Sequence, residues 1–231
     1  IGGALYDNPG LDMLALLCGS EGMLGIVTEV TVALLPEPEK KSVILAGFRQ
    51  VTDAGNAVAS IIGAGIIPAG MEMMDKLAVE AAEQFAHAGY PLDAAAILII
   101  ELDGAAAELD AVTHQVIGHL QACGAYQIDQ ADDAQTQARL WKGRKSAFPA
   151  VGRLSPDYIC MDGTIPRHKL AQVLTQIDTL SKAYDLAVAN VFHAADGNLH
   201  PLILFDANVP GQTDHAMAMG SEILRCCVAA G

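Results

Sequence analysis

The stretch AVANVFHAADGNLHPLILF, residues 187–205, decides the fold of this chain. Its two apolar runs flank Asp196-Gly197, and Asp-Gly is a dipeptide favoured in two-residue turns between antiparallel strands. A turn at these two residues pairs 195 with 198, 194 with 199, and His193 with His200. The stretch therefore predicts a β-hairpin, and with it an antiparallel sheet.

In this hairpin the two histidines lie side by side on one face of the sheet, and Asn198 falls on the same face. Directly opposed side chains have Cβ atoms about 4.5–5.5 Å apart, so two ring nitrogens can reach one divalent ion. The alternative is a pair of ordinary histidines hydrogen-bonded to backbone, and two ligands alone do not complete a zinc site. We favour a site, because this polar cluster interrupts strands that are otherwise apolar.

Outward from the hairpin, strand-like and helix-like runs alternate along the chain. Strands are expected at residues 42–48, 69–74, 95–102, 126–129, 158–164, 187–192 and 199–205. Helices are expected at residues 52–63, 76–88, 105–123, 132–148, 167–184 and 215–228. This order predicts an α+β fold, with a large, mostly antiparallel sheet and helices on one face, arranged as a doubled ferredoxin-like unit.

Residues 1–40 differ from the rest of the chain. A short helix is expected at 11–17 and a strand at 26–35, and the proline- and charge-rich segment 36–41 is typical of a linker. Between them, GSEGMLGI at 19–26 places three glycines directly before the expected strand. Glycine lets backbone N–H groups approach phosphate oxygens, so a nucleotide-binding loop is one interpretation and a tight turn with positive φ is the other.

Composition limits the classes of function. The chain has 231 residues, is 52% hydrophobic and carries 13 Lys and Arg against 27 Asp and Glu, for a net charge of −14. This charge repels phosphate backbones and anionic bilayers, which argues against nucleic-acid binding. No apolar run reaches the roughly 18 residues that a membrane span needs. The five cysteines include no C-x-x-C pattern, which favours reduced thiols in a cytosolic protein.

A small group of cations stands out in this acidic chain. Arg139, Lys142, Arg144 and Lys145 lie near the end of one expected helix, beside the single tryptophan. Arg144 can take a carboxylate through two parallel hydrogen bonds. The alternative is that these cations only stabilise the negative end of the helix dipole.

Two acidic residues are given structural interpretations. Asp162 precedes Gly-Thr-Ile-Pro and is typical of a turn. Glu72, in MEMMD at 71–75, is interpreted as part of a solvated strand end, with an inward carboxylate as the alternative.

Five segments, taken in order, resemble the FAD-linked oxidases of 2-hydroxy acids, the family that includes glycolate oxidase flavoprotein subunits and D-lactate dehydrogenases. GSEG-x-LGI and HA-x-DGNLHP are together specific, and the resemblance covers essentially the whole chain. The segments are GSEGMLGIVTEV (19–30), MEMMD (71–75), LWKGRKSAF (140–148), D-x-x-IPR (162–167) and HAADGNLHP (193–201).

The resemblance implies how the chain is divided. Residues 1–40 would be the trailing part of an FAD-binding domain, and residues 41–231 would be a substrate or cap domain. The larger part of the FAD-binding domain is expected before Ile1. A Gly-Glu-His-Gly segment, with a carboxylate ligand and a candidate base, is expected after Gly231. The 231 residues alone are therefore expected to be inactive.

The resemblance also implies roles for individual residues. His193 and His200 would bind a divalent metal (Zn, Mn or Fe) or the substrate beside the flavin, Asn198 would support them, and Arg144 would hold the substrate carboxylate. Two positions depart from the family pattern, Met23 in place of threonine and Ala195 in place of glycine, and the second bears on the hairpin register. The residues expected to border the FAD are Gly19, Ser20, Gly22, Gly25 and Ile26.

The intact protein is expected to oxidise a small 2-hydroxy acid, glycolate or D-lactate, to the 2-oxo acid by hydride transfer to FAD. We expect an oligomer with partner redox subunits, located in the cytoplasm and associated with the inner face of the membrane through those partners. Two other classes stay open. One is a metal-dependent hydrolase that uses His193 and His200, which a third carboxylate ligand would favour. The other is a non-catalytic interaction domain with an acidic docking face.

Overall fold

The computed structural model describes residues 10–231, so the first nine residues of the expected domain 1–40 lie outside the described part. The chain divides into two units, one ending at Glu37 and one spanning Pro38–Gly231. In the first unit, helix α1 (Met13–Leu17) begins at Asp12, whose side chain accepts a hydrogen bond from the backbone N–H of Ala15 at 3.0 Å. The second unit holds the sheet and the other helices.

The strand expected at residues 26–35 is wrong, because this segment has no regular structure. Its alternating apolar side chains point to solvent, with Ile26 and Leu34 both 89% exposed. A strand needs a neighbour to pair its backbone groups, and residues 10–37 contain no other strand.

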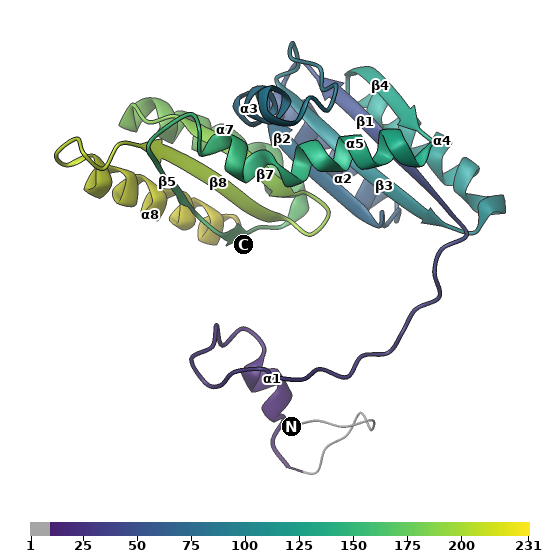
Figure 1. Ribbon diagram of the computed structural model, residues 1–231, viewed down its shortest axis with the longest axis horizontal. Helices are drawn as coiled ribbons and strands as arrows, with labels where there is room; N and C mark the ends of the chain where they lie inside the picture. The colour runs from purple at the N-terminus through teal and green to yellow at the C-terminus, as the bar shows by residue number, and fades with distance from the viewer. Residues whose placement is uncertain (1–9) are drawn as a thin grey trace. The chain divides into compact units, whose positions relative to one another are not determined.

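The strands of the second unit form one 8-stranded antiparallel sheet, in the order β4-β1-β3-β2-β7-β8-β5, with β6 also paired to β8 (Figure 1). The strands are β1 (Lys40–Phe48), β2 (Gly70–Asp75), β3 (Ala96–Gly104), β4 (Ala125–Ala131), β5 (Asp157–Cys160), β6 (Gly163–Thr164), β7 (Val188–His193) and β8 (Asn198–Phe205). The helices are α2 (Val51–Gly63), α3 (Lys76–Ala86), α4 (Ala106–Ala122), α5 (Ala134–Lys145), α6 (Ala147–Val151), α7 (Leu170–Tyr184) and α8 (Gln212–Ala230). No helix within residues 10–231 is both long and apolar enough to cross a membrane.

The order of the elements confirms the α+β fold and its doubled ferredoxin-like arrangement. The first half runs β1-α2-β2-β3-α4-β4, with α3 inserted between β2 and β3, and its strands lie in the order β4-β1-β3-β2. The second half repeats the pattern with β5, α7, β7, β8 and α8. The halves join where β2 pairs antiparallel with β7, in the register Glu72 to His193 and Met74 to Val191.

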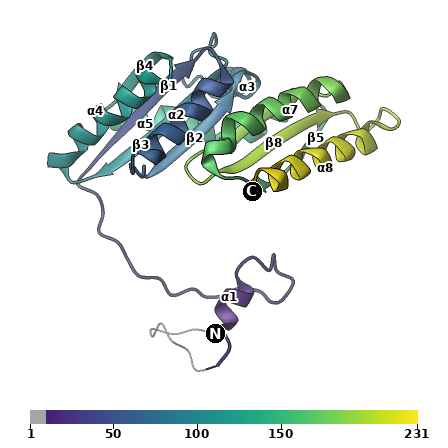
Figure 2. The same cartoon turned by 180° about the vertical axis from the view of Figure 1, so that it is seen from behind.

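Helices cover both faces of the sheet, so the expectation of helices on one face is only partly met. One core lies under α2, α4, α7 and α8, which Figure 2 shows in front of the strands. A second core lies under α3, α5 and α6 on the opposite face, here called the three-helix face. In β3, Leu98 and Ile100 belong to the first core, and Ile97 and Ile99 to the second. The run AILII at 96–100 is apolar at every position, which is typical of a strand covered on both faces.

Two expected elements are interrupted. The helix expected at 132–148 ends at Lys145, and α6 follows with Pro149 in its first turn, where a helix tolerates a residue without an N–H. The strand expected at 158–164 is divided into β5 and β6. Residue Asp162 lies in the gap, off the strand ladder.

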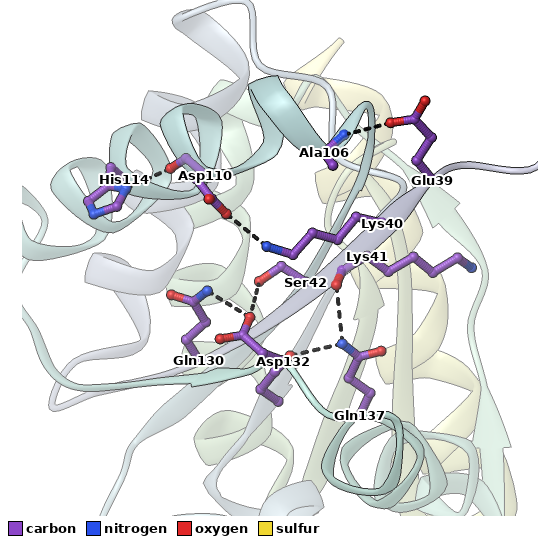
Figure 3. Close-up of polar contacts among 11 residues, drawn as sticks. Glu39, Lys40, Lys41, Ser42, Ala106, Asp110, His114, Gln130, Asp132 and Gln137 are labelled. Atoms are coloured by element: carbon purple, nitrogen blue, oxygen red, sulfur yellow. Dashed lines mark hydrogen bonds and ion pairs between the residues drawn. The ribbon is translucent and has the colours of Figure 1, made fainter.

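Polar contacts at the start of β1 fix the position of α5, as Figure 3 shows. The amide of Gln137, in the first turns of α5, donates to the carbonyl oxygens of Lys41 at 3.3 Å and Ala131 at 2.9 Å. Asp133 caps the same helix by accepting from the N–H of Thr136 at 2.8 Å. The side chain of Tyr90 donates to the carbonyl of Leu140 from the other side. These contacts hold the helix that carries Arg144.

Asp75 ties the two halves of the sheet together. Asp75 is 9% exposed. Its Oδ1 accepts a hydrogen bond from the N–H of Ala78 at 3.0 Å and so caps the start of α3. Its Oδ2 accepts from the backbone N–H of Asn190 at 2.8 Å and from the side-chain amide of the same residue at 2.7 Å. Burial raises the pKa of Asp75 to about 6, although these hydrogen bonds lower it in part.

The raised pKa predicts how stability depends on pH. The folded state binds the Asp75 proton more tightly than the unfolded state, so ionisation of Asp75 lowers the free energy of unfolding as pH rises from about 4 to about 6. The expected loss is on the order of 3 kcal/mol at most. Urea unfolding of the parent and of Asp75→Asn across this range measures it. As pH rises, the free energy of unfolding of the parent should fall relative to that of Asp75→Asn. A difference in free energy that stays constant with pH would show that Asp75 does not titrate in this way.

Candidate active site

The hairpin forms, but its register differs from the expected one. His193 pairs with Asn198, and Val191 pairs with His200, so the loop contains the four residues 194–197 and the expected pairing of His193 with His200 is wrong. The register is displaced by two residues. Because side chains alternate with a period of two, His193 and His200 stay on the same face as diagonal neighbours, and Asn198 lies there too.

The loop residues explain the register. A two-residue type I′ turn needs positive φ at both central positions, yet only Gly197 has it, with φ of 80°. Asp196 instead accepts a hydrogen bond from the N–H of Asn198 at 3.0 Å, and the N–H of Ala195 donates to the carbonyl of Met71 on β2 at 3.2 Å. A Cβ on Gly197 would lie 2.2 Å from the carbonyl oxygen of Ile165, so the close approach of these backbones requires glycine.

The two imidazole rings lie in contact. Their centroids are 5.0 Å apart and their planes are nearly perpendicular, at 89°. The side chain of His193 is 46% exposed and that of His200 is 14% exposed. Burial lowers the pKa of His200, and the nearby charge of Asp162 opposes this in part. The ring of His200 is therefore neutral near pH 7 and has one nitrogen lone pair to offer.

A buried ion pair lies beside the histidines on the three-helix face. Arg144, in the last turn of α5, is 7% exposed. Its Nε donates to Glu72 Oε2 at 2.9 Å, and its Nη2 lies 2.7 Å from the same oxygen without the alignment of a hydrogen bond. Glu72 also contacts His193 Nδ1, at 2.9 Å from Oε1 and 3.0 Å from Oε2. The structure thus brings Arg144 and His193 together through one carboxylate.

Glu72 is the residue that sequence reasoning misplaced. Its side chain is only 13% exposed, so the interpretation as a solvated strand end is wrong and the inward carboxylate is present. The signal was a glutamate between methionines in MEMMD, opposite a strand that ends in histidine. Of the four neighbouring cations, Arg144 alone turns inward; Arg139, Lys142 and Lys145 are exposed.

Two further polar groups complete the cluster. Asp162 Oδ1 lies 3.4 Å from His200 Nδ1, so this residue does more than form a turn, although its side chain is 72% exposed. Asn198 pairs with His193 across the hairpin, and its Oδ1 is buried without a hydrogen-bond partner among the described residues. A buried acceptor without a partner indicates a place where a donor from a bound molecule or water fits.

The donor set fits part of a metal site. Both Nδ1 atoms face a carboxylate, Glu72 for His193 and Asp162 for His200, as in metal-binding histidines whose other nitrogen is oriented by an acid. Residues 10–231 contain no cluster of three or more His, Cys, Asp or Glu side chains placed to hold a metal ion. The two histidines of the described part alone are therefore fewer ligands than zinc requires.

The glycine-rich segment of the first unit forms an irregular loop. Positive φ values occur at Gly19 (77°), Glu21 (51°) and Gly22 (79°), and the N–H of Met23 donates to the carbonyl of Ser20 at 2.8 Å. Alternation of positive and negative φ turns successive N–H groups toward one side, as in loops that bind anions. A Cβ on Gly19 or Gly22 would have no atom of the described residues within 4 Å, so space does not require glycine at these positions. The positive φ of both residues is what favours glycine there.

Comparison with known proteins assigns the family. Residues 37–231 match the family described as FAD linked oxidases, C-terminal domain, and the chain belongs to it. It is 56% identical over 231 residues to the glycolate oxidase subunit GlcD of Escherichia coli (strain K12), covering 100% of this chain and 46% of that protein. It is 34% identical over 225 residues to GlcD of Bacillus subtilis (strain 168), covering 97% of this chain and 48% of that protein. The chain thus spans about half the length of the curated relatives it matches.

A solved structure shows the same fold. An alkyldihydroxyacetonephosphate synthase matches with a TM-score of 0.67 at 16% sequence identity, over 96% of this chain and 46% of that one. At this identity the likeness extends to the arrangement of the backbone alone.

Proposed function

We propose that this chain is the substrate-binding part of a flavin-dependent oxidoreductase that converts a small 2-hydroxy acid, such as glycolate or D-lactate, to the 2-oxo acid. The observation that carries the proposal is the joint placement of a buried arginine and two adjacent histidines on one face, linked by Glu72. Family membership and the similarity to a protein named glycolate oxidase subunit support it.

Arg144 is the group that binds the substrate carboxylate. Its Nε and one edge of its guanidinium face Glu72, which leaves the N–H groups of Nη1 for a ligand. A guanidinium paired with a carboxylate away from bulk water gives a short, charge-assisted hydrogen bond. Glu72 balances the charge of Arg144 before the substrate arrives, so the buried cation is never left unpaired.

The histidines act at the hydroxyl end of the substrate. His200 is neutral, and a neutral imidazole nitrogen can accept a hydrogen bond from the hydroxyl and orient it. The ring of His193 lies beside it, and Asn198 Oδ1 is buried on the same face without a partner among the described residues. Together these groups fix the position of the carbon between the carboxylate and the hydroxyl, which is the carbon to be oxidised.

Two groups not carried by the chain complete the proposal. FAD supplies the hydride acceptor when bound, and we assign Gly19, Ser20, Gly22, Gly25 and Ile26 to its border. A divalent ion held by His193 and His200 would supply Lewis acidity at the hydroxyl, with its remaining ligands from elsewhere. The match to the FAD linked oxidases favours this activity over a metal-dependent hydrolase that uses the same two histidines.

The relatives named as subunits suggest the setting in which the protein works. We propose that it assembles with partner redox subunits into an oligomer in the cytoplasm. Any association with the inner face of the membrane would then pass through those partners.

The test is oxidation of a panel of acids by the protein expressed together with a flavin-binding half like that of its relatives. Glycolate and D-lactate should yield their 2-oxo acids with an artificial electron acceptor, whereas 3-hydroxypropionate should react far more slowly. Absence of 2-oxo acid from every 2-hydroxy acid tested, in a preparation that contains bound flavin, would overturn the proposal.

A further inference from the structure

Glu72 is the centre of the polar cluster. It lies on β2 at the junction of the two halves of the sheet, opposite His193 in the register, and its side chain is 13% exposed. Its two oxygens contact both functional groups of the cluster, Arg144 on one side and His193 on the other. Neither group reaches the other directly in the hydrogen bonds of the described residues, so Glu72 determines their relative position.

The contact with His193 determines which ring nitrogen is free. A carboxylate can only accept hydrogen bonds, and His193 Nδ1 lies 2.9 and 3.0 Å from its two oxygens. Nδ1 must therefore carry the proton in the neutral ring. The lone pair is then on Nε2, which is the nitrogen available to a metal ion or to a substrate hydroxyl.

The contact with Arg144 holds its guanidinium beside the ring of His193. Arg144 Nη2 lies 2.7 Å and His193 Nδ1 3.0 Å from the same oxygen, Glu72 Oε2. Two nitrogens that contact one oxygen at these distances lie within about 6 Å of each other. Glu72 therefore keeps the guanidinium proposed to bind the carboxylate next to the ring proposed to bind the hydroxyl.

We propose that Glu72 is the positioning residue of this site, which orients His193 through Nδ1 and Arg144 through Nε. This inference rests on the proposed function for its substrate, but the effect on His193 can be measured without any substrate.

The first experiment uses the 231-residue chain and nitrogen NMR of its histidines, with His193→Gln to assign the signal. The parent should show a proton on His193 Nδ1 and a free lone pair on Nε2. In Glu72→Gln the side-chain amide can donate as well as accept, so the population of His193 with its proton on Nδ1 should fall relative to the form with its proton on Nε2. A neutral parent His193 with its proton on Nε2 and its lone pair on Nδ1 would overturn the inference, even if Glu72→Gln does not fold.

The matched control is Glu101→Gln. Glu101 lies on β3 on the same face, its side chain is 19% exposed, and it pairs with Lys41 at 3.3 Å, outside the cluster. Titrated with Zn²⁺ alone, Glu72→Gln should bind about 10–100-fold more weakly than the parent, and Glu101→Gln should match the parent. Equal weakening in both variants would mean a general loss of structure and would count against the assigned role.

The second experiment measures kcat and KM in the protein with its flavin-binding half. Glu72→Gln should lower kcat/KM for glycolate by about 10–100-fold, whereas Glu101→Gln should leave it near the parental value. If the parent oxidises glycolate and Glu72→Gln does so equally well, the inference fails and the proposed function stands. If the parent oxidises no 2-hydroxy acid, the proposed function fails, and the NMR and Zn²⁺ results still decide the role of Glu72.

Discussion

Replacing His193 or His200 with alanine is expected to lower kcat/KM for glycolate by about 10²–10⁴-fold, the range typical of a lost acid–base or charge-stabilising group. The two rings touch and lie on one face with Arg144, so each variant removes one of the groups that we propose to hold the substrate hydroxyl. Steady-state kinetics with glycolate, in the protein with its flavin-binding half, measures the effect.

The matched control is His168→Ala. His168 is exposed on the 3-10 turn Arg167–Lys169, and its loss should leave kcat/KM within about 2-fold of the parent. Near-parental kcat/KM in both His193→Ala and His200→Ala would show that these residues have no part in the reaction.

Replacing Arg144 with methionine is expected to lower the free energy of unfolding by about 3–5 kcal/mol, because it leaves the charge of Glu72 buried and unpaired by a cation. The double variant Glu72→Met with Arg144→Met should recover part of this loss, since it removes both charges and keeps apolar volume. Urea unfolding of the parent, both single variants and the double variant measures the coupling.

Arg225→Met provides the comparison. Arg225 pairs with Glu222 on the exposed side of α8, with 71% of its side chain accessible, so its loss should cost less than about 1 kcal/mol. A loss of similar size in Arg144→Met, or a double variant less stable than either single one, would contradict the description of Arg144 and Glu72 as a buried pair.

Most elements of the fold follow from local patterns in the sequence. The runs around Asp196-Gly197 predict both strands of the hairpin to within about two residues, as is usual for such patterns. The register could not be predicted, because it depends on contacts between residues that are far apart in sequence. These contacts are the hydrogen bond from Ala195 to Met71 on β2 and the close approach of Gly197 to Ile165. The shift of two residues preserved the face and therefore the proximity of the histidines.

The second face of the sheet was recognisable in principle. The all-apolar run AILII at 96–100 indicates burial on both sides, whereas helices on one face require alternation. The partner of Arg144 was harder to predict, because Glu72 lies 72 residues away on strand β2 and only the pairing of β2 with β7 brings it beside His193.

The most direct test of the account is anaerobic reduction of the flavin by glycolate deuterated at the carbon between its carboxylate and its hydroxyl. In the proposed function, Arg144, His193 and His200 hold this carbon for hydride transfer to the flavin. Ordinary glycolate should bleach the flavin in a single turnover, and the deuterated acid should do so more slowly. A flavin that stays oxidised with either acid, in protein that holds it stoichiometrically, would contradict the account.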